Sequence, residues 1–102
     1  MSYGDYLASD RRLVMLRILK GAPGHSLNCR SMQKVLIGAG HRVSLDRVRT
    51  EAAWLEEQGV IKTEPFEAAA AKGYMILTLT QRGTDVANGH TEVPGIDVPS
   101  GD

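Results

Sequence analysis

The chain has 102 residues with one cysteine, and 42% of its side chains are hydrophobic and 24% charged. This size predicts one domain, and the composition excludes a disordered chain, a disulfide framework and a multi-cysteine metal site. Because no apolar run approaches the length of a membrane span, and the amino terminus has no signal-peptide pattern, we expect a cytoplasmic protein with no membrane partner.

The net charge of zero hides an uneven distribution along the chain. Residues 11–50 carry nine basic side chains and one acidic one, whereas residues 51–102 carry three basic and nine acidic ones. Such a split indicates a polyanionic partner for the basic half. A solvated basic surface offset by an acidic one explains the same numbers, so charge alone leaves both interpretations open.

The first two predicted elements are helices. Residues 9–20 have the apolar spacing of an amphipathic helix, with Gly21 just past its end. The glycines and the proline of residues 21–27 then predict a loop. Asn28 is placed to cap a second, short helix, which Gly38 and Gly40 end.

A third helix follows after a tight turn. Ser44 is its predicted cap, and the helix runs to Gln58 and stops at Gly59. Two short helices joined by a tight, glycine-containing turn are typical of a helix-turn-helix. Alternating residues in 60–66 and 73–80 then predict a β-hairpin.

Thr80 is placed to cap a last helical piece that Gly89 ends, and the tail contains Pro94 and Pro99. We therefore predict an α+β fold, a winged helix-turn-helix with a three-helix core, a two-stranded wing and a short carboxy-terminal helix. Its domain spans residues 1–89. The tail, residues 90–102, is expected to be extended and poorly ordered, or an arm laid on a partner.

The helix 45–58 has a core face and an outer face. On a helical wheel Arg47, Thr50 and Trp54 point away from the core, while Glu51 flanks it. The core face itself consists of Leu45, Val48, Ala52 and Leu55. In a recognition helix the amino-terminal residues reach base edges in the major groove, which here predicts contacts by Arg47 and Thr50.

The remaining predicted contacts surround that end of the helix. Arginine binds guanine or phosphate, whereas serine and threonine mainly fix the position of the protein on the backbone. The full predicted DNA-binding set is Arg30, Lys34, Arg42, Ser44, Arg47, Arg49, Thr50 and, in the wing, Lys72. Trp54 is a predicted interface residue, covered by the wing, the tail or a second subunit, since leaving an indole in water forgoes a few kcal/mol.

Two stretches, VRTEAAWLEEQGVIKTE and YMILTLTQRGTDVANG, are similar to winged-helix regulators of the MarR and ArsR types. Nearly the whole chain resembles a family of small proteins encoded by Mu-like phages and prophages. The shared features are SYGDYLASDRRL, GHRVSLDRVRTEAAWLEEQGVI, LTQRGTDVANG and VPGIDVP. The resemblance implies a winged-helix fold and DNA binding. This chain departs from the regulators in two ways. Its wing is acidic, so that Glu64 and Glu67 would repel phosphates, and it lacks the thiolate cluster of an ArsR metal sensor.

No motif predicts an enzyme, a cofactor or a metal site. Cys29 and His25 are four residues apart, but two ligands make a weak site, and a small buried thiol is the commoner outcome. We therefore expect a homodimeric, sequence-specific phage regulator that binds double-stranded DNA through helix 45–58. The alternative is a winged-helix module that binds a phage or host protein during phage assembly or DNA packaging.

Overall fold

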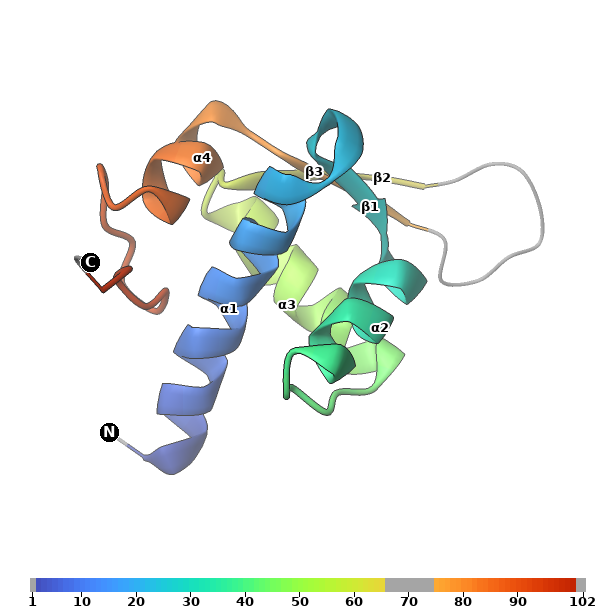
Figure 1. The fold of residues 1–102 in the computed structure, drawn as a ribbon, viewed down its shortest axis with the longest axis horizontal. Helices are drawn as coiled ribbons and strands as arrows, with labels where there is room; N and C mark the ends of the chain where they lie inside the picture. The colour runs from blue at the N-terminus through green and yellow to red at the C-terminus, as the bar shows by residue number, and fades with distance from the viewer. Residues whose placement is uncertain (1, 66–74, 101–102) are drawn as a thin grey trace.

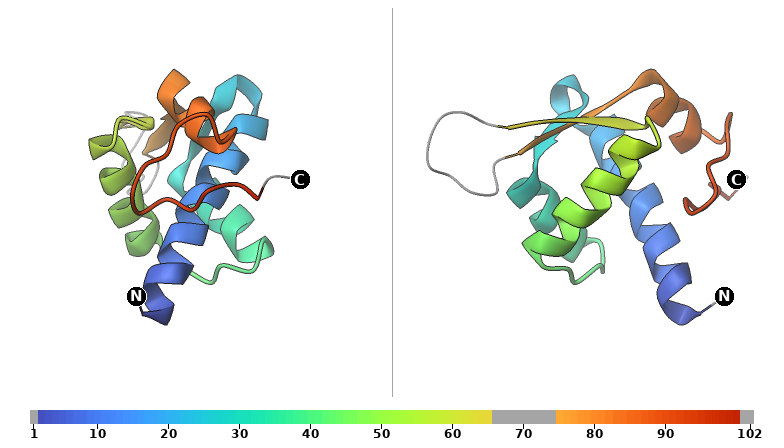
Figure 2. Two further views of the ribbon diagram at one scale, coloured as in Figure 1. Left: turned by 90° about the vertical axis from the view of Figure 1, so that its left-hand side faces the viewer. Right: turned by 180° about the vertical axis from the view of Figure 1, so that it is seen from behind.

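The computed structural model describes residues 2–65 and 75–100, which fold into four α-helices and a three-stranded antiparallel sheet. Figure 1 shows α1 in front of α3, and the view from behind in Figure 2 shows α3 in front. In chain order the elements are α1 (Tyr3–Gly21), a 3₁₀ turn (Pro23–His25), β1 (Ser26–Asn28), α2 (Cys29–Gly38), α3 (Leu45–Glu57), β2 (Ile61–Glu64), β3 (Ile76–Leu79) and α4 (Gln81–Ala87). The predicted α+β class is confirmed.

Side-chain caps fix where the helices begin. Asn28, Ser44 and Thr80 each accept a hydrogen bond from the backbone N–H three residues on, as the sequence predicted. The start of α1 was predicted wrongly, because it lies six residues earlier than expected. Ser2 and Asp5 form a reciprocal capping box there, which begins the helix before its apolar pattern becomes regular.

The sheet has one strand more than the sequence predicted. Its order is β1-β3-β2, with Leu27 opposite Leu77 and Ile61 opposite Leu79. The predicted loop at residues 21–27 was therefore wrong in its last part, since β1 lies there. Three residues are too few to show the alternation of apolar and polar side chains that marks a strand, and their partner strand lies about fifty residues away in the sequence. The predicted hairpin is present as β2 and β3, and its connection lies outside the described residues.

The core lies between α1, the helix pair α2–α3 and the sheet. Met15, Leu16, Met32 and Leu36 are among its fully buried members. At its edge α4 approaches the sheet so closely that a Cβ added to Gly83 would lie 2.1 Å from the carbonyl oxygen of Val60. No side chain fits at residue 83 without moving the backbone, so the packing of α4 depends on a glycine there.

The carboxy-terminal tail folds back onto the domain. Val93 and Ile96 are buried and join the core, and the backbone N–H of Asp97 donates to the carbonyl of Ser9 in α1. Figure 2 shows this segment crossing α1. The tail, expected to be extended and poorly ordered or an arm laid on a partner, thus lies against its own domain through residue 100, because two of its apolar side chains enter the core.

Candidate nucleic-acid interface

The turn between α2 and α3 is held by contacts to two helices, α2 and α1. The Nε2 amide of Gln33 in α2 donates to the carbonyl of Val43 at 3.0 Å, and the backbone N–H of His41 donates to the carbonyl of Leu36 at 2.8 Å. His41 Nε2 lies 2.9 Å from Oδ2 of Asp10 in α1. The turn therefore presents the start of α3 from a fixed position.

The first turn of α3 is open to solvent. Ser44, Asp46, Arg47 and Thr50 are exposed, while Arg49 is half-buried. The Ser44 hydroxyl accepts from the N–H of Arg47 at 3.1 Å, and the Thr50 hydroxyl donates to the carbonyl of Asp46 at 3.0 Å. Arg49 Nη1 lies 3.8 Å from the Asp46 carboxylate, too weak a pair to neutralise either group at this exposure. The helix thus offers an accessible end with a fixed backbone.

Further cations lie on α2 and in the turn that precedes α3. Arg30 and Lys34 are one helical turn apart on the exposed face of α2, and Arg42 is exposed in the turn itself. Together with Arg47 and Arg49 they are accompanied by one acidic residue, Asp46, in the segment 29–50 that the structure describes. Of the eight residues of the predicted DNA-binding set, six are exposed and Arg49 is half-buried. The eighth, Lys72, lies outside the described residues.

The other four cations of the basic half lie on α1, and two of them pair with a buried acid. Glu51 of α3 is 1% exposed, and its two oxygens accept from Arg11 Nη1 at 2.8 Å and from Arg12 Nε at 3.0 Å. Glu51 was predicted to flank the core but is part of it. These two arginines of α1 therefore neutralise a buried carboxylate rather than extend the basic surface.

Trp54 lies beside the same cluster, under the tail. The guanidinium of Arg12 sits 4.0 Å from the centroid of the indole ring and also donates to the carbonyl of Gly95 at 2.9 Å. A Cβ on Gly95 would lie 2.9 Å from the ring. The sequence left open whether the wing, the tail or a second subunit covers Trp54, and in the structure the tail of the same chain does so. Nothing local predicts this arrangement, because Arg12 lies 39 residues from Glu51 and 83 residues from Gly95 in the sequence.

Comparison with known proteins shows which family the chain belongs to. It is 40% identical over 95 residues to gp26 of Escherichia phage Mu, an uncharacterized protein, and the match covers 93% of each chain. The chain belongs to this family of Mu-like phage proteins. It is also 40% identical over 82 residues to an uncharacterized protein of Haemophilus influenzae, covering 80% of this chain and 76% of the relative. No protein-family model matches the chain.

Cys29 of this phage-family member is a structural residue. It is fully buried, whereas His25 is exposed. Burial raises the pKa of the Cys29 thiol, partly offset by the nearby charge of Arg49, so the thiol is neutral and unreactive near pH 7. Among residues 2–65 and 75–100 no three histidine, cysteine or acidic side chains cluster as metal ligands, and no helix there is long and apolar enough to cross a membrane.

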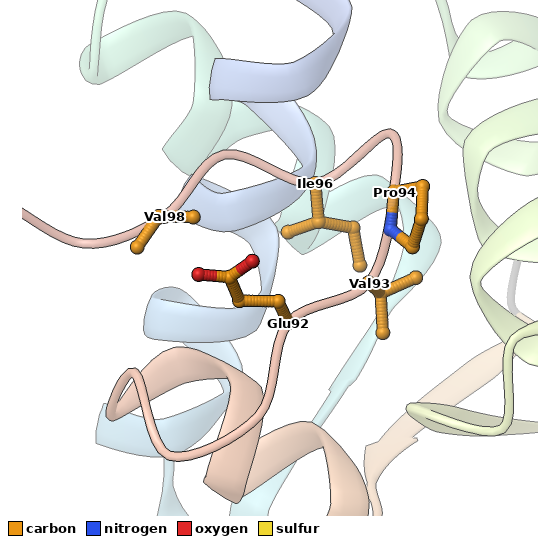
Figure 3. A pocket seen from close by; sticks show the side chains of 5 residues that line it. All are labelled: Glu92, Val93, Pro94, Ile96 and Val98. Atoms are coloured by element: carbon orange, nitrogen blue, oxygen red, sulfur yellow. The ribbon is translucent and has the colours of Figure 1, made fainter.

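A cavity of about 340 Å³ lies within the tail. Figure 3 shows Val93, Pro94, Ile96 and Val98 around it with the carboxylate of Glu92. In Figure 1 the tail and α2 lie on opposite sides of the molecule. The cavity is therefore separate from the exposed end of α3.

Proposed function

We propose that this phage protein is a winged-helix DNA-binding protein that acts as a transcriptional regulator. The element order α1-β1-α2-α3-β2-β3 and the sheet order β1-β3-β2 support a winged helix, in which α2 and α3 form the helix-turn-helix and β2 and β3 the base of the wing. In this arrangement α3 enters the major groove by its amino-terminal end.

The observation that carries the proposal is the accessible start of α3 together with the cations of the segment that contains it. Residues 29–50 carry five basic side chains, on α2, in the turn and on α3, and one carboxylate, Asp46, while Asp10 of α1 lies against the turn. Phosphate binding depends on the local charge of a surface rather than on the net charge of the protein, so a neutral protein with a basic segment still attracts a duplex. The residues concerned are Arg30, Lys34, Arg42, Arg47 and Arg49.

Each side chain has a role that its geometry allows. Arg47 is exposed on the first turn of α3, where its guanidinium can donate two parallel hydrogen bonds to a guanine. The Ser44 hydroxyl accepts from the backbone and keeps its proton for a phosphate oxygen. The Thr50 proton is used within the helix, which leaves its methyl group to contact thymine. Arg42 and Lys34 then hold the backbone on either side.

Asp46 is the feature that opposes phosphate binding. Its side chain is 94% exposed beside Arg47, so it repels the duplex and lowers affinity for DNA of any sequence. A carboxylate at this place can instead accept from the exocyclic amine of cytosine. Asp46→Asn should therefore tighten non-specific binding while weakening discrimination between sequences.

The test is a titration of labelled duplexes from the genome of the phage that carries this protein, followed by fluorescence anisotropy at several salt concentrations. Arg47→Ala should weaken binding to a preferred fragment by about 1–3 kcal/mol and relax preference at one base position. Arg17→Ala is the matched control, because it removes an exposed arginine from α1 instead. Equal affinities of the Arg47→Ala and Arg17→Ala proteins for every fragment would refute the proposal.

The second candidate is the protein-interaction module. It is favoured by the exposed aromatic side chains Tyr3 and Tyr6, which are 78% and 61% accessible at the start of α1. Salt separates the two candidates, because phosphate-driven binding weakens steeply as salt rises. A protein that is not retained by duplex DNA or heparin at low salt would favour the docking module.

A further inference from the structure

The exposed large hydrophobic side chains of the described residues form two groups. Within residues 2–65 and 75–100, one group lies at the start of α1 and in the tail, and the other lies on α2. The first consists of Tyr3, Tyr6, Leu7 and Val98, and the second of Val35 and Ile37. Because the tail and α2 lie on opposite sides of the molecule in Figure 1, the two groups do not meet within one chain.

The first group belongs to an acidic patch formed by residues 2–10 and 91–98. The backbone N–H of Asp97 donates to the carbonyl of Ser9, which joins the tail to α1 just after Tyr6 and Leu7, and Figure 2 shows the tail crossing the helix there. The two segments contain neither lysine nor arginine, and their acids are Asp5, Asp10, Glu92 and Asp97. The cavity of the tail lies in this patch, with the Glu92 carboxylate beside its apolar walls (Figure 3). The patch therefore suits a partner that is both apolar and basic.

The exposed face of α2 has that character. Lys34 is exposed, and the spacing of three residues sets Ile37 on the same side of the helix, one turn further on. Val35 is exposed on the other flank of Lys34. The helix contains two cations and no acidic residue. The α2 face, meaning Lys34, Val35 and Ile37, is thus opposite in charge to the acidic patch and like it in carrying exposed apolar side chains.

We propose that the acidic patch of one copy of this chain binds the α2 face of a second copy. Ile37 enters the cavity of the tail, whose volume of about 340 Å³ is sufficient for an aliphatic side chain. Lys34, one turn before it, then donates to the carboxylate of Glu92. Because the two surfaces differ, the contact is heterologous: each pair keeps one free surface at either end, and further copies extend it into an open chain or a ring.

Charge selects this contact over a symmetric one. A two-fold pair through the acidic patch would set the acids of one copy against the same acids of the other, with no lysine or arginine of residues 2–10 or 91–98 to offset them. A two-fold pair through the α2 face would likewise set Lys34 near Lys34. Like charges brought together across an interface oppose binding, whereas opposite charges favour it. The patch of one copy therefore binds the α2 face of the next.

This inference does not rest on the proposed function, although Lys34 belongs to both surfaces. Self-association is measured on protein free of nucleic acid. DNA binding is measured at protein concentrations low enough for the chain to be monomeric. Either property can therefore fail while the other is found.

Sedimentation velocity of the full chain from micromolar to near-millimolar concentrations tests the contact. The mass of the wild-type protein should rise past that of a dimer with concentration and fall as salt is added. Lys34→Glu and Val98→Asp should each weaken association by about tenfold or more, because the first sets a like charge against Glu92 and the second sets a charge against Ile37. Lys62→Glu is the control, since it makes the same change of charge on β2 and should associate as the wild type does.

A mixture of the two variants shows whether the contact is heterologous. The Lys34→Glu protein keeps an intact patch and the Val98→Asp protein an intact α2 face, so an equal mixture should form dimers and nothing larger. The side chains of residues 34 and 98 are exposed, so the thermal melts of both variants should match that of Lys62→Glu. The proposal is overturned by a wild-type protein that stays monomeric at every concentration, or by a single variant that associates as well as Lys62→Glu. A mixture that stays monomeric, or that grows past dimers, overturns it equally.

Discussion

Replacing Glu51 by glutamine should destabilise the fold strongly, because this carboxylate is buried between two arginines. Its oxygens accept from Arg11 and Arg12 at 2.8 and 3.0 Å, and the residue is 1% exposed. Glutamine keeps the shape of the side chain and one acceptor, but its amide group turns N–H donors toward a guanidinium that also only donates. Two partly buried cations then lack a counter-charge, and breaking a buried pair in this way costs about 3–5 kcal/mol.

That loss is a large share of the stability of a domain of this size, which is about 5–15 kcal/mol. Since each kcal/mol shifts the midpoint of a 60–100-residue domain by about 4–8 °C, Tm should fall by at least about 12 °C. Circular dichroism during thermal and urea unfolding measures the change. Glu57→Gln removes an exposed carboxylate from the same helix and should be neutral within about 0.5 kcal/mol. Equal stabilities of the Glu51→Gln and Glu57→Gln proteins would show that the buried pair contributes nothing.

Three more predictions concern single residues. Gly95→Ala should cost about 1–3 kcal/mol more than Gly40→Ala, because both glycines have φ above +90° but only the first has an indole ring where the Cβ would lie; urea unfolding compares them. Gly83→Ala should cost about 3 kcal/mol or more, given the carbonyl oxygen 2.1 Å from the new methyl group, and a thermal melt that matches wild type would contradict this packing. Cys29 should resist thiol reagents in the native state. Because its pKa is raised on folding, the contribution of Cys29 to the free energy of unfolding should be constant below about pH 8.5 and fall as pH rises further, when the unfolded thiol ionises first; the difference between pH-dependent urea titrations of wild type and Cys29→Ser tests this.

The parts of the fold that were predictable are those whose cause is local. Asn28, Ser44 and Thr80 cap helices because of hydrogen bonds three residues away, and alternation marks β3. By contrast β1 exists only because β3 pairs with it from a distance. The packing of the tail likewise depends on where α1 lies, which the spacing of its residues does not specify.

The same difference between local and long-range causes applies to the candidate site. The exposure of Arg47 on α3 follows from helical periodicity, and the structure agrees with it. The pairing of Arg11 and Arg12 with Glu51 joins residues about forty positions apart, so charge counting included these arginines in the basic half although both are partly buried against a carboxylate. A count of charges along a sequence therefore overstates the basic surface wherever a buried acid pairs with some of them.

The contact between the tail and Trp54 gives the molecule a natural optical probe. Trp54 is the single tryptophan of the chain, and its ring lies against the Arg12 guanidinium and close to Gly95. Lifting the tail would expose this indole to water without unfolding the helices, so the emission maximum would move to longer wavelength while the far-ultraviolet circular dichroism stayed constant. Detachment of the last residues can thus be timed and titrated in unlabelled protein, separately from global denaturation.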